Sequence, residues 1–302
     1  MIYHAIELQK TLLSPAVDLA SATSRLLLHP RSPLANTYLG RTIAANHELF
    51  ARLHRRYAKP SFGIESIERA GGKVAIHEEL VHKRPFCSLL RMRRAESVQL
   101  AKLLVVAPLS GHFATLLRDT VRTALQDFEV YVTDWTDARL VPLAVGPFHL
   151  DDYVEYVREF VTWIGPNSQV LAVCQPTVPV LAAVALMAED GDPCTPRSVT
   201  LMAGPIDARL HPTEVNRFAN SKPFSWFEKR LIHSVPMNYP GFRRKVYPGF
   251  LQHVSFIAMN PDRHLKAHRD FYLDVVRGKH NDAQAHRTFY DEYNAVLDMA
   301  AE

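Results

Sequence analysis

The chain has 302 residues, of which 47% are hydrophobic and 22% are charged, and its formal net charge is +4. This composition excludes a disordered or fibrous protein. The longest apolar run, at 178–188, is shorter than the roughly 20 residues that span a bilayer, so we expect no transmembrane segment.

Residues 1–63 are predicted to form an N-terminal helical region. Apolar side chains recur there at three- and four-residue spacing, and Pro15, Pro30 and Pro33 are expected to divide the region. From about residue 73 a β-hairpin is predicted. Its basic part, "HKRPFCSLLRMRR" at 82–94, carries no aromatic ladder or helix-turn-helix pattern, so we interpret it as a solvated strand edge and expect no nucleic-acid partner.

Residues 64–210 are predicted to form an α/β core. Apolar runs typical of buried strands alternate with stretches of helical periodicity; the strands are expected at 102–109, 128–135, 169–174 and 198–206, and the helices at 112–127, 151–165 and 178–190. This alternation predicts βαβ crossovers and a mostly parallel sheet with helices on both faces. The alternation of strand and helix patterns ends after residue 210. Residues 211–302 are predicted to form a C-terminal helical cap or insertion without further strands.

Cys174 is a candidate nucleophile. In "QVLAVCQPTVPVL" it ends a predicted strand, and a helix is expected to start directly after it. This is the context of a nucleophile elbow, which needs small residues two positions before and after the nucleophile; Ala172 and Pro176 occupy those positions. The alternative is a buried structural cysteine, an interpretation that fits Cys87 and Cys194 better. Three cysteines without CxxC spacing favour a reducing compartment, by default the cytoplasm.

The predicted position of Cys174 suits thiolate chemistry. A helix N-terminus favours the negatively charged form of a thiol. The backbone N–H of Gln175 would face a carbonyl under attack, and a second donor is expected from the loop "PLSGHF", where Gly111 allows close approach.

Several segments resemble the intracellular poly(3-hydroxybutyrate) depolymerases, in which a cysteine replaces the serine of an α/β-hydrolase triad. The resemblance is carried by "VVAPLSGHFATLLRDTVRTALQD", "VYVTDWTDARLVPLAVGPFHLDDYVEYV", "VLAVCQPTVPVLAAVALMAEDGDPCTPRSVTLMAGPID" and "VYPGFLQ". It implies an α/β-hydrolase fold, a Cys174 thioester, no metal or organic cofactor, and ester hydrolysis at the surface of polyester storage granules in the cytoplasm. It also implies that the oxyanion is held by Gln175 and by the loop of Ser110, Gly111, His112 and Phe113.

The acid and histidine of that family's triad follow the last two strands of the sheet. No position here matches them, so we expect a C-terminally truncated chain that lacks those strands and is inactive by itself. Asp207, after the last predicted strand, is a candidate acid, although a turn or helix cap is an alternative. Among the aromatic residues of 211–302, Trp226 and Phe227 are candidates for polymer contact.

The sequence leaves two other functions open. A polyester synthase also uses a cysteine on an elbow, but its GxCxG glycines are absent from "AVCQP". A truncated chain would also fit a non-catalytic protein that binds the granule surface. The sequence leaves the oligomeric state open.

Overall fold

The computed structural model describes residues 2–96, 99–109, 112–297 and 299–302. The chain forms two compact units. Unit 1 comprises Met1–Lys59 and Phe250–Asp298, and unit 2 comprises Pro60–Gly249 and Met299–Glu302. The predicted boundaries after residues 63 and 210 stay predictions.

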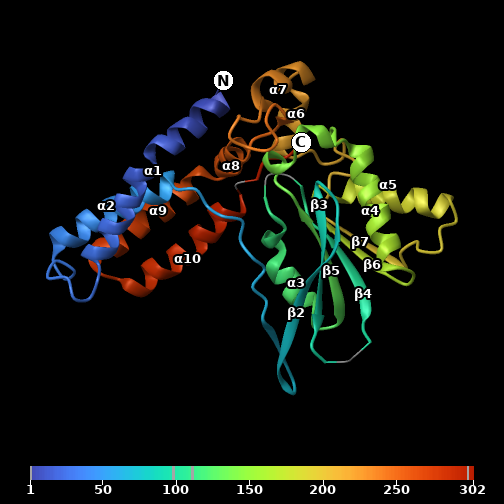
Figure 1. The fold of residues 1–302 in the computed structure, drawn as a ribbon, viewed down its shortest axis with the longest axis horizontal. Coiled ribbons are helices and arrows are strands. Elements are labelled where there is room, and N and C mark those ends of the chain that lie inside the picture. Colours follow the sequence, from blue (N-terminus) through green and yellow to red (C-terminus); the bar gives the residue numbers. More distant parts are fainter. Residues whose placement is uncertain (1, 97–98, 110–111, 298) are drawn as a thin grey trace. The chain divides into compact units, whose positions relative to one another are not determined.

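Unit 2 contains a mixed sheet, which confirms the predicted α/β class. Within the described residues it has seven strands in the order β1-β2-β3-β5-β4-β6-β7 (Figure 1). The pairs on the β1 side, up to β3 with β5, are antiparallel, and β5, β4, β6 and β7 run parallel. The strands are β1 (Ser66–Arg69), β2 (Gly72–Lys83), β3 (Cys87–Arg94), β4 (Ala101–Val106), β5 (Phe128–Trp135), β6 (Gln169–Val173) and β7 (Ser198–Met202).

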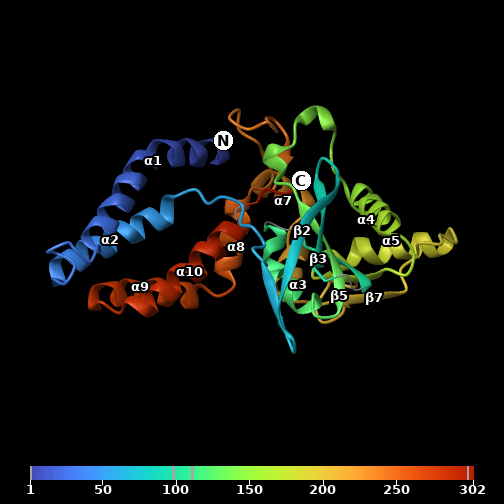
Figure 2. The same ribbon diagram turned by 60° about the horizontal axis from the view of Figure 1, so that its bottom comes forward.

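Helices cover both faces of the parallel part. Helix α3 (Arg118–Ala124), preceded by the 3₁₀ turn η1 (Ala114–Leu117), lies on one face, whereas α4 (Leu150–Ile164) and α5 (Thr177–Glu189) lie on the other (Figures 1 and 2). This division follows from right-handed crossovers that leave the central strands in opposite directions. The core between the layers consists of fully buried side chains such as Leu104, Val105, Val130 and Val132.

The basic stretch at 82–94 is not a solvated edge, contrary to the sequence-based interpretation. It comprises the end of β2 and the whole of β3, and β3 pairs with β2 on one side and with β5 on the other. Arg91 forms ion pairs with Glu79 and Glu129 on the flanking strands. Arg94 is buried and donates a hydrogen bond to the carbonyl oxygen of Leu125 at 2.9 Å. Carboxylates on the flanking strands therefore neutralise Arg91, and backbone carbonyl oxygens accept the hydrogen bonds of Arg94.

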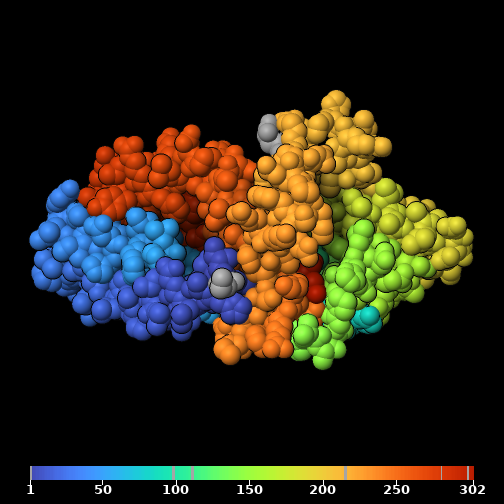
Figure 3. Space-filling view, turned by 90° about the horizontal axis from the view of Figure 1, so that it is seen from above, coloured from blue at the N-terminus to red at the C-terminus, as the bar shows by residue number. Residues whose placement is uncertain are grey.

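The part of unit 2 after residue 203 contains more than helices. Helices α6 (Glu214–Asn220) and α7 (Phe224–Leu231) precede a two-stranded sheet of β8 (His233–Ser234) and β9 (Lys245–Val246), so the expectation of no further strand was wrong. Strands of two residues are too short to leave a hydrophobic period in the sequence. The last residues pack here too: Ala300 accepts a hydrogen bond from Ala138, and Figure 3 shows this red segment between the green and orange ones.

Unit 1 is helical. Its elements are α1 (Ile2–Leu27), α2 (Tyr38–His54), α8 (Gly249–Ala258, beginning at the last residue of the first segment of unit 2), α9 (Pro261–Arg277) and α10 (His280–Val296). Pro15 lies inside α1 and does not divide it, contrary to the prediction. Val17 and Ala20 pack with Ala51 of α2, and this burial offsets the backbone hydrogen bond that proline removes. None of the described helices is long and apolar enough to span a bilayer.

His286 of α10 contacts α9 in an unusual aromatic stack. The ring of His286 stacks between Phe271 and Tyr290, with centroids 4.5 and 4.4 Å away. Burial, reinforced by the charges of Arg52 and His268, lowers the pKa of His286 to about 4. Its ring is therefore neutral in folded unit 1 near neutral pH, whereas it titrates at an ordinary pKa near 6.5 in the unfolded chain.

Unit 1 is expected to lose stability as the pH falls from about 6.5 to 4, because the unfolded chain then binds a proton at residue 286 that the folded unit excludes. After allowance for partial exposure the loss is on the order of 2 kcal/mol. His286→Phe keeps the stack and should remove much of this dependence. Urea unfolding followed by helical circular dichroism at pH 7 and 4.5 measures it. The exposed His77→Gln is the control, and equal pH dependence in both variants would contradict the assignment.

Candidate active site at the carboxyl end of β6

Cys174 occupies a sharp turn between β6 and α5. Its φ of +68° lies in the left-handed region, which a cysteine rarely adopts, and its side chain is exposed. The turn is held from several directions. The N–H of Cys174 donates to the carbonyl oxygen of Met202 at 2.8 Å, and its carbonyl oxygen accepts from the N–H and hydroxyl of Thr177. A positive φ here directs the thiol away from the strand–helix junction, as an elbow requires.

The elbow lies at a topological switch point of the sheet. Strands β4 and β6 are neighbours, but the crossover after β4 leads to β5, whereas the crossover after β6 leads to β7 on the opposite side. The connections diverge at the carboxyl ends of these two strands, and this is where ligands bind in open α/β sheets. Cys174 directly follows one strand, and the loop beginning at Ala107 follows the other.

Gln175 joins the two loops. Its side-chain Oε1 accepts a hydrogen bond from the N–H of Leu109 at 2.9 Å. Among the residues that the structure describes, the backbone N–H of Gln175 has no acceptor, so this donor is available for an anionic oxygen next to the thiol. The sequence suggested the role of this N–H but not the side-chain bridge, because nothing in "VCQP" indicates that the amide reaches residue 109.

Of the other four residues predicted to hold the oxyanion, the structure describes two. Ser110 and Gly111 lie outside the described residues. His112 and Phe113 follow them and are both buried. The Nδ1 atom of His112 lies 3.3 Å from the carbonyl oxygen of Phe113, and burial lowers the pKa of His112. Burial therefore disfavours the charged form of His112, and its role in the oxyanion loop stays a prediction.

Asp207 is held in a local turn. Both carboxylate oxygens accept hydrogen bonds from the Arg209 guanidinium at 2.8 Å, and the Arg209 N–H donates to the same carboxylate. These hydrogen bonds lower the pKa of Asp207. The geometry supports the alternative of a turn residue, and the catalytic role of Asp207 stays a prediction.

Trp226 and Phe227 lie on α7 and form an aromatic cluster with Phe218. The ring centroids are 5.1–5.9 Å apart and the contacts are edge-on. Both candidates are half-buried, but Phe218 is 49% exposed and Phe224 is 79% exposed. The role of Trp226 and Phe227 in polymer contact also stays a prediction.

The other cysteines have different environments. Cys87 is fully buried in β3, and Cys194 is half-buried in the loop between α5 and β7. The exposed Cys174 is the only one of the three at a positive φ. Within the described ranges, no group of three or more histidine, cysteine, aspartate or glutamate side chains is arranged to hold a metal ion.

Residues 203–302 match the protein family described as PHB de-polymerase C-terminus. The match covers the chain from the end of β7 onward and does not include the elbow. No curated protein matches the chain.

Solved structures of similar fold include esterases. Naproxen esterase from Bacillus subtilis is 10% identical, with 65% of this chain and 62% of that chain covered and a TM-score of 0.33. Brefeldin A esterase, a bacterial homologue of human hormone-sensitive lipase, is 14% identical, with 67% and 60% covered and a TM-score of 0.33. A lipase-like structure from Sulfolobus solfataricus is 13% identical, with 49% and 50% covered and a TM-score of 0.32. The chain spans about half to three-fifths of these proteins.

The positive φ of Cys174 predicts how substitutions at this position change the stability of unit 2. Cys174→Gly is expected to be more stable than Cys174→Ala by about 0.5–1 kcal/mol, because glycine adopts a positive φ without a Cβ clash. At Cys194, which has no positive φ, the glycine variant should instead be the less stable by about 0.5–1 kcal/mol. Denaturant unfolding followed by tryptophan fluorescence measures both pairs, since Trp135, Trp163 and Trp226 all belong to unit 2. The same sign in both pairs would contradict a strained elbow.

Proposed function

We propose that the chain acts on the ester bonds of poly(3-hydroxybutyrate) with Cys174 as the nucleophile. The observation that carries the proposal is the exposed Cys174 at φ +68°, on a strand–turn–helix at the switch point between β4 and β6. The match of residues 203–302 to the PHB depolymerase family supports the polymer as substrate.

The proposed reaction is covalent catalysis. A general base takes the proton of Cys174, and the thiolate attacks the ester carbonyl carbon of the polymer. The carbonyl oxygen becomes an anion that accepts a hydrogen bond from the N–H of Gln175. The C–O bond then breaks, the alcohol end leaves with a proton, and a thioester remains on the sulfur. Water hydrolyses the thioester, which releases a shorter acid and restores the thiol.

The chain from Met202 onward carries exposed apolar side chains, which suit an apolar polyester. Met202, whose carbonyl oxygen holds the N–H of Cys174, is 48% exposed. Further along unit 2, large apolar side chains remain in contact with solvent: Ile206, Leu210, Phe218, Phe224 and Met237. In this proposal these exposed side chains contact the granule.

Acylation of the thiol tests the proposal at its first step. The chain is incubated with a 3-hydroxybutyrate oligomer ester, and thioester adducts are located by mass spectrometry of peptides. We expect an adduct on Cys174, its loss in Cys174→Ala, and no change in Cys194→Ala. Release of 3-hydroxybutyrate units from native amorphous granules is measured with the same three proteins. Equal acylation at Cys174 and Cys194, or equal granule hydrolysis by the chain and Cys174→Ala, would exclude Cys174 as the nucleophile.

A non-catalytic granule-binding protein is the second candidate, and the exposed apolar side chains listed above favour it. Co-sedimentation with granules distinguishes the two. Binding that is equal in Cys174→Ala and in the unchanged chain, without any adduct, would indicate the binding protein.

A further inference from the structure

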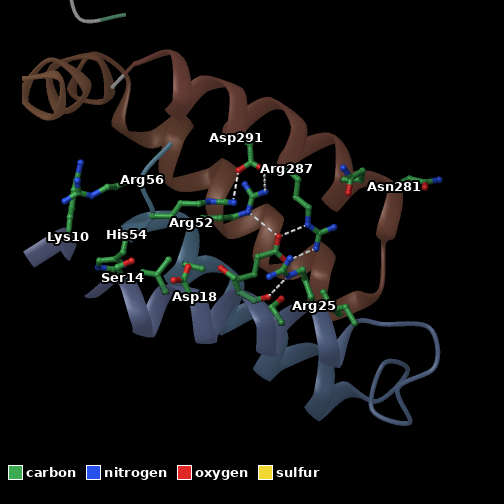
Figure 4. Close-up of a pocket in the computed structure, with 18 residues that line it drawn as sticks. Lys10, Ser14, Asp18, Arg25, Arg52, His54, Arg56, Asn281, Arg287 and Asp291 are labelled. Atoms are coloured by element: carbon green, nitrogen blue, oxygen red, sulfur yellow. Dashed lines mark hydrogen bonds and ion pairs between the residues drawn. The ribbon is translucent and has the colours of Figure 1, made fainter. Parts of the chain in front are cut away.

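Unit 1 contains a groove whose lining residues are all distant in sequence from Cys174. It has a volume of about 940 Å³ and is lined by α1, α2 and α10 (Figure 4). This volume falls in the range of roughly 300–1,000 Å³ that is usual for small-molecule sites. The lining is polar and charged, with six cationic side chains against three carboxylates.

Salt bridges in the middle of the groove are shared among several arginines. Arg52 pairs with Glu48 at 3.2 Å and with Asp291 at 3.0 Å. Glu48 also pairs with Arg287 at 2.6 Å, and Asp291 with Arg55 at 2.8 Å (Figure 4). Glu48 and Asp291 are therefore each shared by two arginines, whereas the third lining carboxylate, Asp18, forms no ion pair with a described residue. Arg52 is 5% exposed, and its Nη1 has no acceptor among the described residues. The Nε atom of Arg55 lacks an acceptor as well.

Two further cations, Lys10 and Arg56, lie at one end of the groove (Figure 4). There Arg56 pairs with Glu7 at 3.1 Å and donates to Thr11 at 3.0 Å. Glu7 lies one helical turn before Lys10 on α1, and Thr11 directly follows Lys10. Lys10 forms no ion pair with any described residue. Lys10 and these ion pairs together comprise five cations and three carboxylates, a surplus of two positive charges. The cations are Lys10, Arg52, Arg55, Arg56 and Arg287, and the carboxylates are Glu7, Glu48 and Asp291.

We propose that this end of the groove binds the phosphate group of a small molecule. A phosphoryl group carries about −1.5 to −2 charges at pH 7, which matches a local surplus of two positive charges. Guanidinium groups bind phosphate through two parallel hydrogen bonds, and an ammonium group adds a point charge. The hydroxyl of Ser14, one turn beyond Lys10, is a further donor in the lining. The rest of the groove, toward Asn281 and Gln284, has polar side chains for the remainder of the ligand.

Binding of inorganic phosphate, measured by isothermal titration calorimetry, tests the proposal. The variant is Lys10→Gln with Arg55→Gln, which leaves Asp291 paired with Arg52. We expect it to weaken binding at least tenfold, as loss of a charge-assisted contact predicts. Arg25→Gln is the matched control. It neutralises a cation of the same groove, but Arg25 lies roughly 22 Å from Lys10 along α1 at 1.5 Å per residue. Its affinity should stay within about twofold of the unchanged chain, well below a tenfold effect.

Further measurements separate the sources of the phosphate group. Vesicles of phosphatidylcholine with and without phosphatidic acid test a lipid headgroup, and glycerol phosphate tests a soluble ester. Binding to either source that is lost in the double variant supports the proposal and identifies the source. No binding to any of the probes would overturn it, as would equal affinity of the double variant or equal affinity for acetate. If the double variant loses helicity, Lys10→Gln alone is used, because it removes no ion pair.

Discussion

Replacing Arg244 with methionine is expected to lower the free energy of unfolding of unit 2 by about 3–5 kcal/mol, the usual cost of leaving buried charged partners unpaired. The side chain of Arg244 is fully buried. Its guanidinium donates to the carbonyl oxygens of Val141, Pro142 and Gly146 at 3.0, 2.6 and 2.8 Å, and to the carboxylate of Glu302. Methionine fills part of the volume but supplies no donor, so four acceptors lose their partner.

Tryptophan fluorescence during urea unfolding measures this loss, since the three tryptophans lie in unit 2. Arg243→Met is the matched control. Arg243 is the exposed neighbour, and its substitution should change stability by less than about 0.5 kcal/mol. Arg244→Lys should fall between the two, because it keeps the charge but loses the planar donors. Similar midpoints for the two methionine variants would refute the central role of Arg244.

Gly204→Ala is expected to cost about 3 kcal/mol and to distort the elbow. A Cβ at this position would lie 1.6 Å from the Oγ1 of Thr177 and 2.4 Å from its Cβ. Thr177 is buried at the start of α5, and its hydroxyl holds the carbonyl oxygen of Cys174 at 2.9 Å. A β-branched side chain on a helix has little freedom to move aside. The substitution must therefore shift Thr177 and, with it, the backbone that presents the thiol.

The expected signature combines a lower unfolding midpoint with slower alkylation or acylation of Cys174. Gly71→Ala serves as the control, because a Cβ there would meet nothing within 4 Å. It should leave stability within about 0.5 kcal/mol and the thiol unaffected. If Gly204→Ala behaves like Gly71→Ala, the close packing of Gly204 on Thr177 does not shape the elbow.

The elbow could be predicted from sequence because its signal is local. "QVLAVC" is an apolar strand run, "VPVLAAVALMAED" is a helical one, and only two residues separate Cys174 from Thr177. The regular βαβ alternation was equally visible, since β4, β5 and β6 are partly or mostly buried and all four parallel strands, including the more exposed β7, carry apolar residues. The short β1 and the β8–β9 pair left no comparable pattern, and the role of Pro15 depended on packing against α2 that no local rule reveals.

Contacts between residues far apart in the chain could not be predicted from the sequence. The acceptors of Arg244 in the 141–146 segment lie about a hundred residues earlier in the chain, and the Leu109 N–H that Gln175 accepts lies 66 residues away. A charged residue in "GFRRKV" indicates exposure by its type, so its burial was not predictable. The interpretation of 82–94 as an edge was wrong for the same reason, because the partners of its arginines lie on strands that only the fold brings together.

The hydrogen bond from the Cys174 N–H to Met202 also couples the nucleophile to the edge of the sheet. Strand β7 is the last strand in the described sheet order, and it pairs only with β6. Edge strands open more readily than central ones in local unfolding. Each excursion of β7 would free the amide of Cys174 and expose it to hydrogen exchange, so the amide's protection factor reports how long the elbow stays formed. The geometry of the thiol is therefore only as persistent as the docking of β7.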